Sequence, residues 1–336
     1  MQGLSMDSLC EKTKNALTKQ SISKYEAGKM MPDSKSLIIL ANALGVSIDY
    51  FFRPLAVSIE NVEFRKKKRL GLKKIESIKA IVKDKLERYF EIESIIDIQS
   101  EFKSEYRSVA IQSESDIFSI VNRIKNDWKL GEDGINNLIE ILEENKIKVI
   151  EIDAPSEFDG LSGYVNEKNP IIVLNKNLDS ERKRFTALHE LGHLLLNFDS
   201  SIDENRVESF CHLFASEMLI SKEIFIQKIG MNRKDISLQE LQDIQMQFGI
   251  SIDALMYKAW NLNIITESRY KTFRIKKSQA PQFKEAVEES RYKQEQSNRF
   301  VRLVYRALAS EIISISKAGV LLNTPVNAVR NQLNLV

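Results

Sequence analysis

The chain has 336 residues and a formal net charge of +2, with 49 Lys and Arg against 47 Asp and Glu. This balance excludes a protein that binds nucleic acid through its overall charge, so such binding would need a local basic region. Hydrophobic residues make up 43% and charged residues 29%, which predicts a soluble globular protein with a sizeable core, and the length predicts two or three domains.

The two cysteines, Cys10 and Cys211, lie in apolar helical patterns, so free buried thiols in a reducing compartment are expected. The N-terminus has no signal-peptide pattern, and no apolar run approaches the roughly 20 residues that span a membrane. The sequence therefore predicts a cytoplasmic protein without membrane contacts.

Residues 1–54 are predicted to form short helices joined by tight turns. Ser5 and Thr18 are suitable helix N-caps, and Gly28 and Gly45 suit the ends of two helices. This order predicts a helix-turn-helix, whose second helix can enter the major groove of DNA.

The same region contains three motifs, namely Leu4-Ser5-Met6-Asp7-Ser8-Leu9, Ile22-Ser23-x-Tyr25-Glu26-x-Gly28 and Leu40-Ala41-x-Ala43-Leu44-Gly45-Val46. They resemble the Xre/Cro family of phage-repressor-like DNA-binding domains. The resemblance implies that the groove-facing side chains of the second helix are Lys19, Gln20, Ser21 and Lys24. Gln can recognise adenine, and Lys can reach guanine or phosphate. Family members usually begin with one further helix, so a truncated domain, or a domain used only for protein contacts, stays open.

Residues 55–110 are expected to connect two domains. Between residues 64 and 90 there are eleven Lys or Arg and three Asp or Glu, a local net charge of +8. Apolar residues recur at helical spacing from Ile75 to Ile96, which predicts an amphipathic helix with a basic face. Such a face is either simply solvated or adds contacts to DNA phosphates.

The spacing of apolar residues changes within the central region, residues 111–265. Helices are predicted at 116–128 and 135–145, and the apolar pattern then alternates, which predicts strands at 146–152, 158–165 and 171–174. The predicted fold is mainly α, of the α+β class. It comprises a helix-turn-helix bundle, a central helical domain with a small three-stranded sheet, and a helical C-terminal region.

The next helix contains His189-Glu190-Leu191-Gly192-His193, a His-Glu-x-x-His motif. Residues four apart lie on one helix face, so His189 and His193 can direct two imidazoles to one point, with Glu190 beside them to hold a water. This arrangement is typical of zinc peptidases of the zincin type. Two packed histidines are the plain alternative, but the three histidines of the chain all lie between residues 189 and 212.

A catalytic zinc needs a third protein ligand and an open position for water. The helix predicted at 204–219 offers Glu208 and His212, which share a face. With Glu208 as the ligand, His212 would orient a ligand imidazole; with His212 as the ligand, the site would hold three histidines. Either choice gives one Zn2+ per chain.

Further motifs accompany this site, namely Trp128-x-Leu130-Gly131, Phe158-Asp159-Gly160-Leu161-Ser162, Arg184-Phe185-Thr186-Ala187-Leu188, Glu208-x-x-Cys211-x-x-Phe214-Ala215-x-Glu217-x-Leu219 and Phe248-Gly249-Ile250-Ser251-x-x-Ala254-Leu255. Together with the His-Glu-x-x-His helix, they resemble the ImmA/IrrE family of zinc metallopeptidases. The resemblance implies Glu208 as the third ligand and a transcriptional repressor or similar regulator as the substrate. Two positions depart from the family: His212 replaces Asn or Asp, and Leu219-Ile220-Ser221 replaces Leu-Met-Pro.

In such a site Glu190 serves as the general base. A second donor to the oxyanion could be Tyr164, Arg182 or Arg184, and Arg184 is equally suited to a structural role. An edge strand of the sheet, within residues 158–174, is expected to lie beside the cleft and to pair with an extended substrate.

The C-terminal region, residues 266–336, is predicted to be helical, with a solvated polar stretch at 285–298. It either packs on the catalytic domain or senses a partner. The sequence thus predicts a zinc endopeptidase tethered to a DNA-binding domain, which cleaves a repressor to derepress stress or mobile-element genes. The alternative is an Xre-type repressor or antitoxin whose metal site is a sensor or a structural element. A homodimer is compatible with both.

Overall fold

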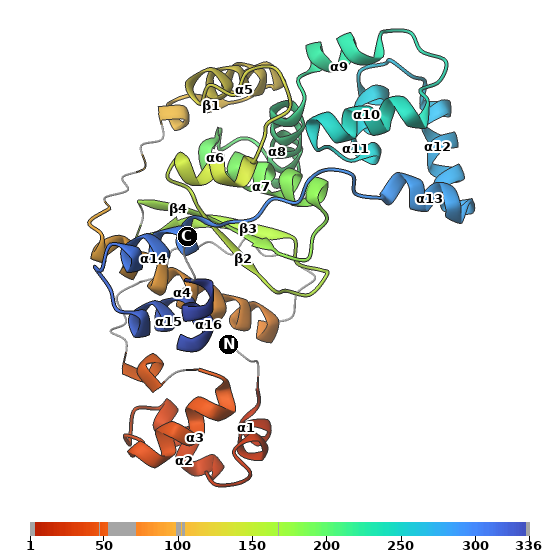
Figure 1. The fold of residues 1–336 in the computed structure, drawn as a ribbon. Helices are drawn as coiled ribbons and strands as arrows, with labels where there is room; N and C mark the ends of the chain where they lie inside the picture. Colours follow the sequence, from red (N-terminus) through yellow and green to blue (C-terminus); the bar gives the residue numbers. More distant parts are fainter. Residues whose placement is uncertain are drawn as a thin grey trace. The chain divides into compact units, whose positions relative to one another are not determined.

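The computed structural model describes residues 4–46, 48–52, 72–98, 102, 105–166 and 168–333. These residues form mainly α-helices with a small three-stranded sheet, which confirms the expected α+β class (Figure 1). The chain divides into two compact units. The first comprises Met1–Ile59, Lys68–Gln99 and Asn298–Val336, and the second comprises Glu60–Lys67 and Ser100–Ser297. No described helix combines the length and the apolarity needed to cross a lipid bilayer.

The N-terminal part of the first unit contains three helices, α1 (Met6–Lys12), α2 (Lys19–Glu26) and α3 (Ser34–Leu44), followed by a 3-10 turn at Ile48–Phe52. The side chains of Ser5, Thr18 and Asp33 each accept a backbone N–H in the first turn of the helix that follows, so each satisfies an otherwise orphaned donor. A small apolar core holds the three helices together, and it contains Leu9, Cys10, Leu17, Ile22 and Leu40.

A second group of helices in this unit consists of α4 (Leu72–Ile95), α14 (Arg299–Ala309), α15 (Ile315–Leu322) and α16 (Val326–Gln332). Polar contacts join α4 to the C-terminal helices: Arg299 binds Glu93 at 2.7 Å, and Arg88 donates to the Leu321 carbonyl at 2.9 Å. The buried side of α4 follows the predicted helical period. The structure thus groups part of the expected connector 55–110 with part of the expected C-terminal region 266–336. Residues 64–71 of the predicted basic segment lie outside the described residues.

The second unit is built on a sheet of three strands in the order β2-β4-β3. The central strand β4 (Asn169–Asn175) pairs in parallel with β2 (Lys148–Ile152) and antiparallel with β3 (Gly160–Val165). Strand β3 is therefore an edge of this sheet, which identifies the edge strand within residues 158–174. A further pair of two-residue strands, β1 (Ala110–Ile111) and β5 (Asn197–Phe198), was not expected from the sequence.

Helix α7 (Ser180–Leu195) lies between this sheet and α8 (Glu204–Leu219), since it contacts β3 and β4 on one side and α8 on the other. The other helices of this unit are α5 (Glu114–Asp127), which packs on α8, α6 (Leu138–Glu144), which packs on α7 and β2, and α9 (Lys222–Ile229), α10 (Leu238–Phe248), α11 (Ile252–Asn261), α12 (Glu267–Gln279) and α13 (Pro281–Glu288). One continuous apolar core extends from Tyr106 to Val287. Because α12 and α13 pack on α11, this unit continues past the boundary expected at residue 265.

The segment 289–297, which connects α13 to α14 (Figure 1), is a strap bound to α7 and β2: most of its residues are exposed, as expected from its polar sequence, but Glu295 is buried. Glu181 of α7 accepts the backbone N–H groups of Arg291 at 3.0 Å and Tyr292 at 3.2 Å. At the other end, Ser297 donates to the Val149 carbonyl on β2 at 2.9 Å. These contacts were not expected, because the partners of the polar groups lie more than a hundred residues earlier in the chain.

Arg184 is the central anchor of this strap. Its side chain is 1% exposed, pairs with Glu295, donates to the Ile135 carbonyl at 2.8 Å and lies 4.3 Å from the ring centre of Tyr292. Removal of one member of a buried ion pair is destabilising, because the remaining charge stays desolvated and loses the attraction that offset this cost.

We therefore expect Arg184→Ala to lower the free energy of unfolding by about 3–5 kcal/mol, measured by urea denaturation. The matched control is Arg182→Ala, since Arg182 pairs with Asp159 but its side chain is 58% exposed. This control should change the free energy by less than about 1 kcal/mol. Equal effects of the two substitutions would contradict the structural role of Arg184.

Candidate metal centre

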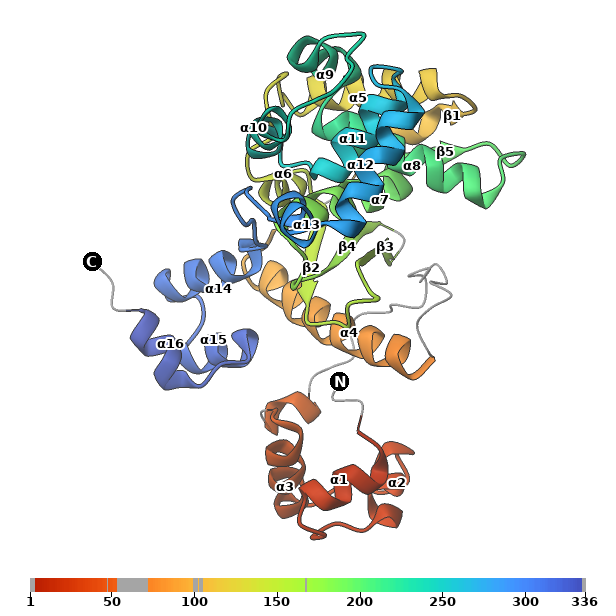
Figure 2. The same cartoon turned by 90° about the vertical axis from the view of Figure 1, so that its right-hand side faces the viewer.

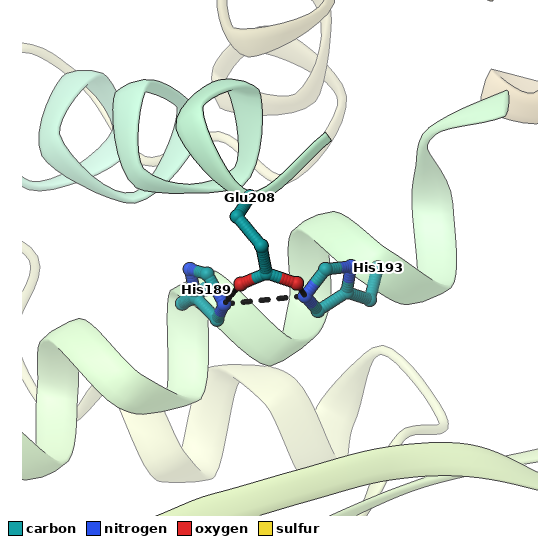
Figure 3. Close-up of side chains that lie close together, drawn as sticks. All are labelled: His189, His193 and Glu208. Carbon is teal, nitrogen blue, oxygen red and sulfur yellow. Dashed lines mark hydrogen bonds and ion pairs between the residues drawn. The ribbon is translucent and has the colours of Figure 1, made fainter. Parts of the chain in front are cut away.

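The two histidines of α7 point to the same place. They lie four residues apart on the helix, and their Nε2 atoms are 3.2 Å from each other (Figure 3). The side chains of His189 and His193 are 13% and 6% exposed, so both imidazoles are largely shielded from solvent.

Helix α8 brings a carboxylate to the same point. It packs on α7 at Gly192, where a Cβ atom would lie 3.3 Å from the Phe214 ring and 3.4 Å from the Cys211 sulfur. This close approach lets Glu208 reach across: its Oε2 is 3.1 Å from Nε2 of His189, and its Oε1 is 3.3 Å from Nε2 of His193 (Figure 3). The hydrogen bonds from the two imidazoles hold the pKa of Glu208 below its ordinary value.

These three side chains fit a tetrahedral divalent metal. Ligand bonds of about 2.0–2.1 Å place tetrahedral donor atoms about 3.3 Å apart, close to the separations of 3.1–3.3 Å found here. Two imidazoles and one carboxylate form a donor set that leaves a fourth position for water or substrate. Within the described ranges, this is the one place where three or more His, Cys, Asp or Glu gather closely enough to hold an ion.

His189, His193 and Glu208 form the candidate metal-ligand group. The glutamate of the motif, Glu190, lies outside this group. Glu190 is 6% exposed, and its Oε2 accepts a hydrogen bond from the Ser162 hydroxyl at 2.8 Å. Ser162 lies on the edge strand β3. This hydrogen bond orients the Glu190 carboxylate, and the second carboxylate oxygen, Oε1, takes no part in it.

Comparison with known protein families agrees with this geometry. Residues 142–259 match the model of the IrrE N-terminal-like domain, Peptidase M78, and residues 1–51 match the model of a helix-turn-helix. The chain carries a helix-turn-helix followed by an IrrE-type peptidase domain. The metal-ligand group, Glu190 and Ser162 all lie within the matched peptidase domain, and the helix-turn-helix supports DNA binding.

The chain is also similar to the protein translocase subunit SecA of Gracilaria tenuistipitata var. liui. The identity is 23% over 228 residues, which cover 61% of this chain and 25% of that protein. The chain thus spans about a quarter of the length of that relative, and translocation is a property of that protein alone.

A thiol contacts one imidazole of the candidate metal centre. The sulfur of Cys211 on α8 lies 3.2 Å from Nδ1 of His193, and Cys211 is a buried free cysteine. When Nε2 of a histidine binds a metal, Nδ1 carries the proton and needs an acceptor, so this contact fixes the ring orientation. The apolar helical pattern places Cys211 only in the core, and Ser162 is only one residue of a motif. Neither contact has a signal in the local sequence.

His212 lies beside the site but outside the metal-ligand group. It is exposed on α8, its ring centre is 4.5 Å from that of His189, and it stacks on Phe185 at 5.8 Å. Its imidazole is turned towards other rings and does not join the group formed by Glu208 and the two α7 histidines. This arrangement favours Glu208 over His212 as the third ligand.

The expected oxyanion donors have other partners. The Tyr164 hydroxyl donates to the Leu194 carbonyl at 2.8 Å, and burial raises the pKa of Tyr164. Arg184 is buried by its contacts with Glu295, Tyr292 and the Ile135 carbonyl, so it is not placed to contact a substrate. Its position favours the structural role. Arg182 is exposed and pairs with Asp159 at 2.9 Å.

The four expected DNA contacts all lie on α2 but differ in their surroundings. Gln20 and Lys24 are exposed. Ser21 makes a 2.9 Å hydrogen bond with the Thr18 hydroxyl at the helix cap, and Lys19 is paired with Asp7, which raises the pKa of Lys19. Gln20 and Lys24 are thus the more accessible pair.

Metal content separates the two ligand choices. We expect Glu208→Ala to lose the bound metal and His212→Ala to keep about one ion per chain, measured by elemental analysis after dialysis. Glu204→Ala is the matched control, since Glu204 is an exposed carboxylate in the first turn of the same helix. Loss of metal from His212→Ala but not from Glu208→Ala would reverse the assignment.

Proposed function

We propose that this chain is a zinc-dependent endopeptidase coupled to a DNA-binding domain. It cleaves a transcriptional repressor or similar regulator and thereby derepresses stress or mobile-element genes. The observation that carries the proposal is the position of Glu190. This buried carboxylate lies next to the two histidines in the chain, accepts a hydrogen bond from the edge strand, and stays outside the ligand group.

The proposed metal ligands are His189, His193 and Glu208, and the distances among their donor atoms suit zinc. A zinc ion held by them would polarise the scissile carbonyl and lower the pKa of a bound water towards neutrality. Cys211 keeps the His193 ring in the orientation that presents Nε2 to this position.

Glu190 is the proposed general base. Its carboxylate takes a proton from the attacking water and passes that proton to the leaving amine when the peptide bond breaks. The hydroxyl of Ser162 donates to Glu190 Oε2, so the oxygen that handles the proton is Oε1. A carboxylate that is fixed before the substrate arrives costs little reorganisation during the reaction.

Strand β3 is the proposed substrate platform. Its inner side pairs with β4, and its outer side is the edge of the three-stranded sheet. An extended peptide can add to such an edge through main-chain hydrogen bonds, which gives affinity with little dependence on side chains. Ser162 lies on this strand, so a peptide paired there would pass close to Glu190.

The alternative function is a helix-turn-helix repressor or antitoxin whose metal site is a sensor or a structural element. A structural zinc site is closed by four protein ligands and does not use a separate base. The three-residue ligand group and the fixed carboxylate of Glu190 favour the peptidase. We place the protein in the cytoplasm, where free thiols such as Cys10 and Cys211 persist.

The role of Glu190 is tested by Glu190→Gln, which keeps the shape of the side chain but removes the base. We expect metal content to stay unchanged and cleavage to fall by about 10²–10⁴-fold. The measurement is the proteolysis of regulators encoded beside this gene by the zinc-loaded full chain, with Glu204→Gln as the isosteric control.

Cleavage that continues undiminished in Glu190→Gln would contradict its role as the base. Failure of the zinc-loaded wild type to cut any of these regulators would contradict the proposed substrate class.

DNA recognition by α2 is tested with Gln20→Ala and Lys24→Ala in the full chain. We expect Gln20→Ala to relax preference at one base pair, a loss of about 1–3 kcal/mol, because a bidentate contact is removed. Lys24→Ala should weaken binding to all sequences and reduce the salt dependence by about one counterion. Fluorescence anisotropy on a selected duplex measures both, with Lys271→Ala on α12 as the charge control. Unchanged binding in both α2 variants would contradict these assignments.

A further inference from the structure

The last three helices of the chain have the geometry of a second helix-turn-helix. Helix α15 ends at Leu322 and α16 begins at Val326, so three residues connect them. Asn323 adopts the left-handed conformation, with φ 53°, and the Thr324 N–H donates to the Gly319 carbonyl at 2.9 Å. A turn of three or four residues between two helices is typical of this motif.

Gly319 makes this turn possible. A Cβ atom at this position would lie 3.0 Å from the Thr324 carbonyl oxygen and 3.5 Å from the Val326 side chain. The start of α16 therefore packs directly on the backbone of α15. The absence of a side chain at Gly319 allows this close approach, and Asn323 is of a residue type that tolerates the left-handed conformation.

The three helices share a small core with α4, since α4 contacts α14 and α15. Helix α14 contacts α15, and α15 contacts α16 (Figure 2). A hydrogen bond from the Tyr305 hydroxyl to the Gln332 side chain also ties α14 to the end of α16. The buried side chains of this core are Leu303, Val304, Ala307, Ile313, Ala318, Leu321 and Val329.

The exposed side of α16 has the chemistry of a DNA-reading surface. Asn327, Arg330 and Asn331 are exposed, and their spacing of three and four residues places them on one face. Asn pairs bidentately with adenine and Arg with guanine, so these are residue types that recognise base edges. They carry no acidic neighbour on α16, whose sequence is Val-Asn-Ala-Val-Arg-Asn-Gln.

The charge of this group of helices also suits a polyanion. Residues 298–333 contain five Lys or Arg and one acidic residue, Glu311. Two of the basic residues, Arg299 and Lys317, pair with Glu93 and Glu91 on α4. Arg306 on α14 and Arg330 on α16 are exposed and can contact phosphates or bases.

We propose that α14, α15 and α16 form a second DNA-binding module, in which the exposed face of α16 contacts base edges in the major groove of duplex DNA. The chain then carries two DNA readers, α2 and α16, on segments separated by the peptidase domain. Its operator contains two different sequence elements, and the linkage of the two modules raises the affinity for DNA that carries both.

The test is selection of binding sequences from a random duplex pool by the full chain, followed by affinity measurements on the selected duplex. We expect two sequence elements. Arg330→Ala and Asn331→Ala should each weaken binding about tenfold and abolish preference within one element only. Gln20→Ala should affect the other element. Arg330→Lys should keep the salt dependence but lose the base preference, since Lys lacks the planar fork of Arg.

Arg274→Ala is the matched control, because Arg274 is an exposed arginine on α12 of the second unit and its removal changes the net charge equally. Helix content measured by circular dichroism confirms that each α16 variant remains folded. A single selected element, or wild-type binding by folded α16 variants, would overturn the proposal, as would a protein partner that binds α16 in place of DNA. Peptide cleavage should be unchanged in these variants, so a failure here is distinct from a failure of the peptidase assignment.

Discussion

The close packing of α7 and α8 at Gly192 is the contact on which the candidate site depends. The motif on α7 supplies two imidazoles, but it cannot form a site without a third donor from another element. A Cβ atom at position 192 would already lie 3.3 Å from the Phe214 ring and 3.4 Å from the Cys211 sulfur, so a side chain larger than alanine would meet both residues. A displacement of one ångström or so would separate Glu208 from both imidazoles, since each contact is already 3.1–3.3 Å long. The same contact brings the Cys211 sulfur to His193.

Helix α7 performs two tasks with its two halves. The C-terminal half carries the histidines and Glu190, while the N-terminal half carries Glu181, Lys183 and Arg184, all buried and all bound to other segments. Lys183 pairs with Glu151 on β2 at 2.6 Å, and Glu181 and Arg184 hold the strap. These charged contacts offer little net stability compared with apolar packing, but they fix the helix in one position along its axis. Fixing α7 also fixes the ligands, because a helix moves as a rigid body.

The sequence contained the signals that are local and periodic. The helical spacing of His189 and His193 and the alternation that predicts strands near 148–152 and 160–165 depend only on neighbours in the chain. The helical pattern allows either Glu208 or His212 as the third ligand, because the two residues share a helix face. Only the packing of α8 on α7 distinguishes them, since it brings Glu208 to the two histidines. Ser162, Cys211 and the strap could not be predicted, since their partners are distant in sequence. The polar stretch near residue 290 is mostly exposed, as expected, but the groups that bind it lie on α7 and β2.

The two edges of the three-stranded sheet differ in accessibility. The outer side of β2 receives Ser297, whose hydroxyl donates to the Val149 carbonyl, while β3 forms the opposite edge. Only a chain whose own amides are unpaired can add to β3, because residues within a helix or an internal strand have already used these groups. A folded regulator would therefore be cut only in a linker or in a segment that has transiently unfolded. For the proposed enzyme, selectivity would then lie in the dynamics of its target as much as in the residues around the scissile bond.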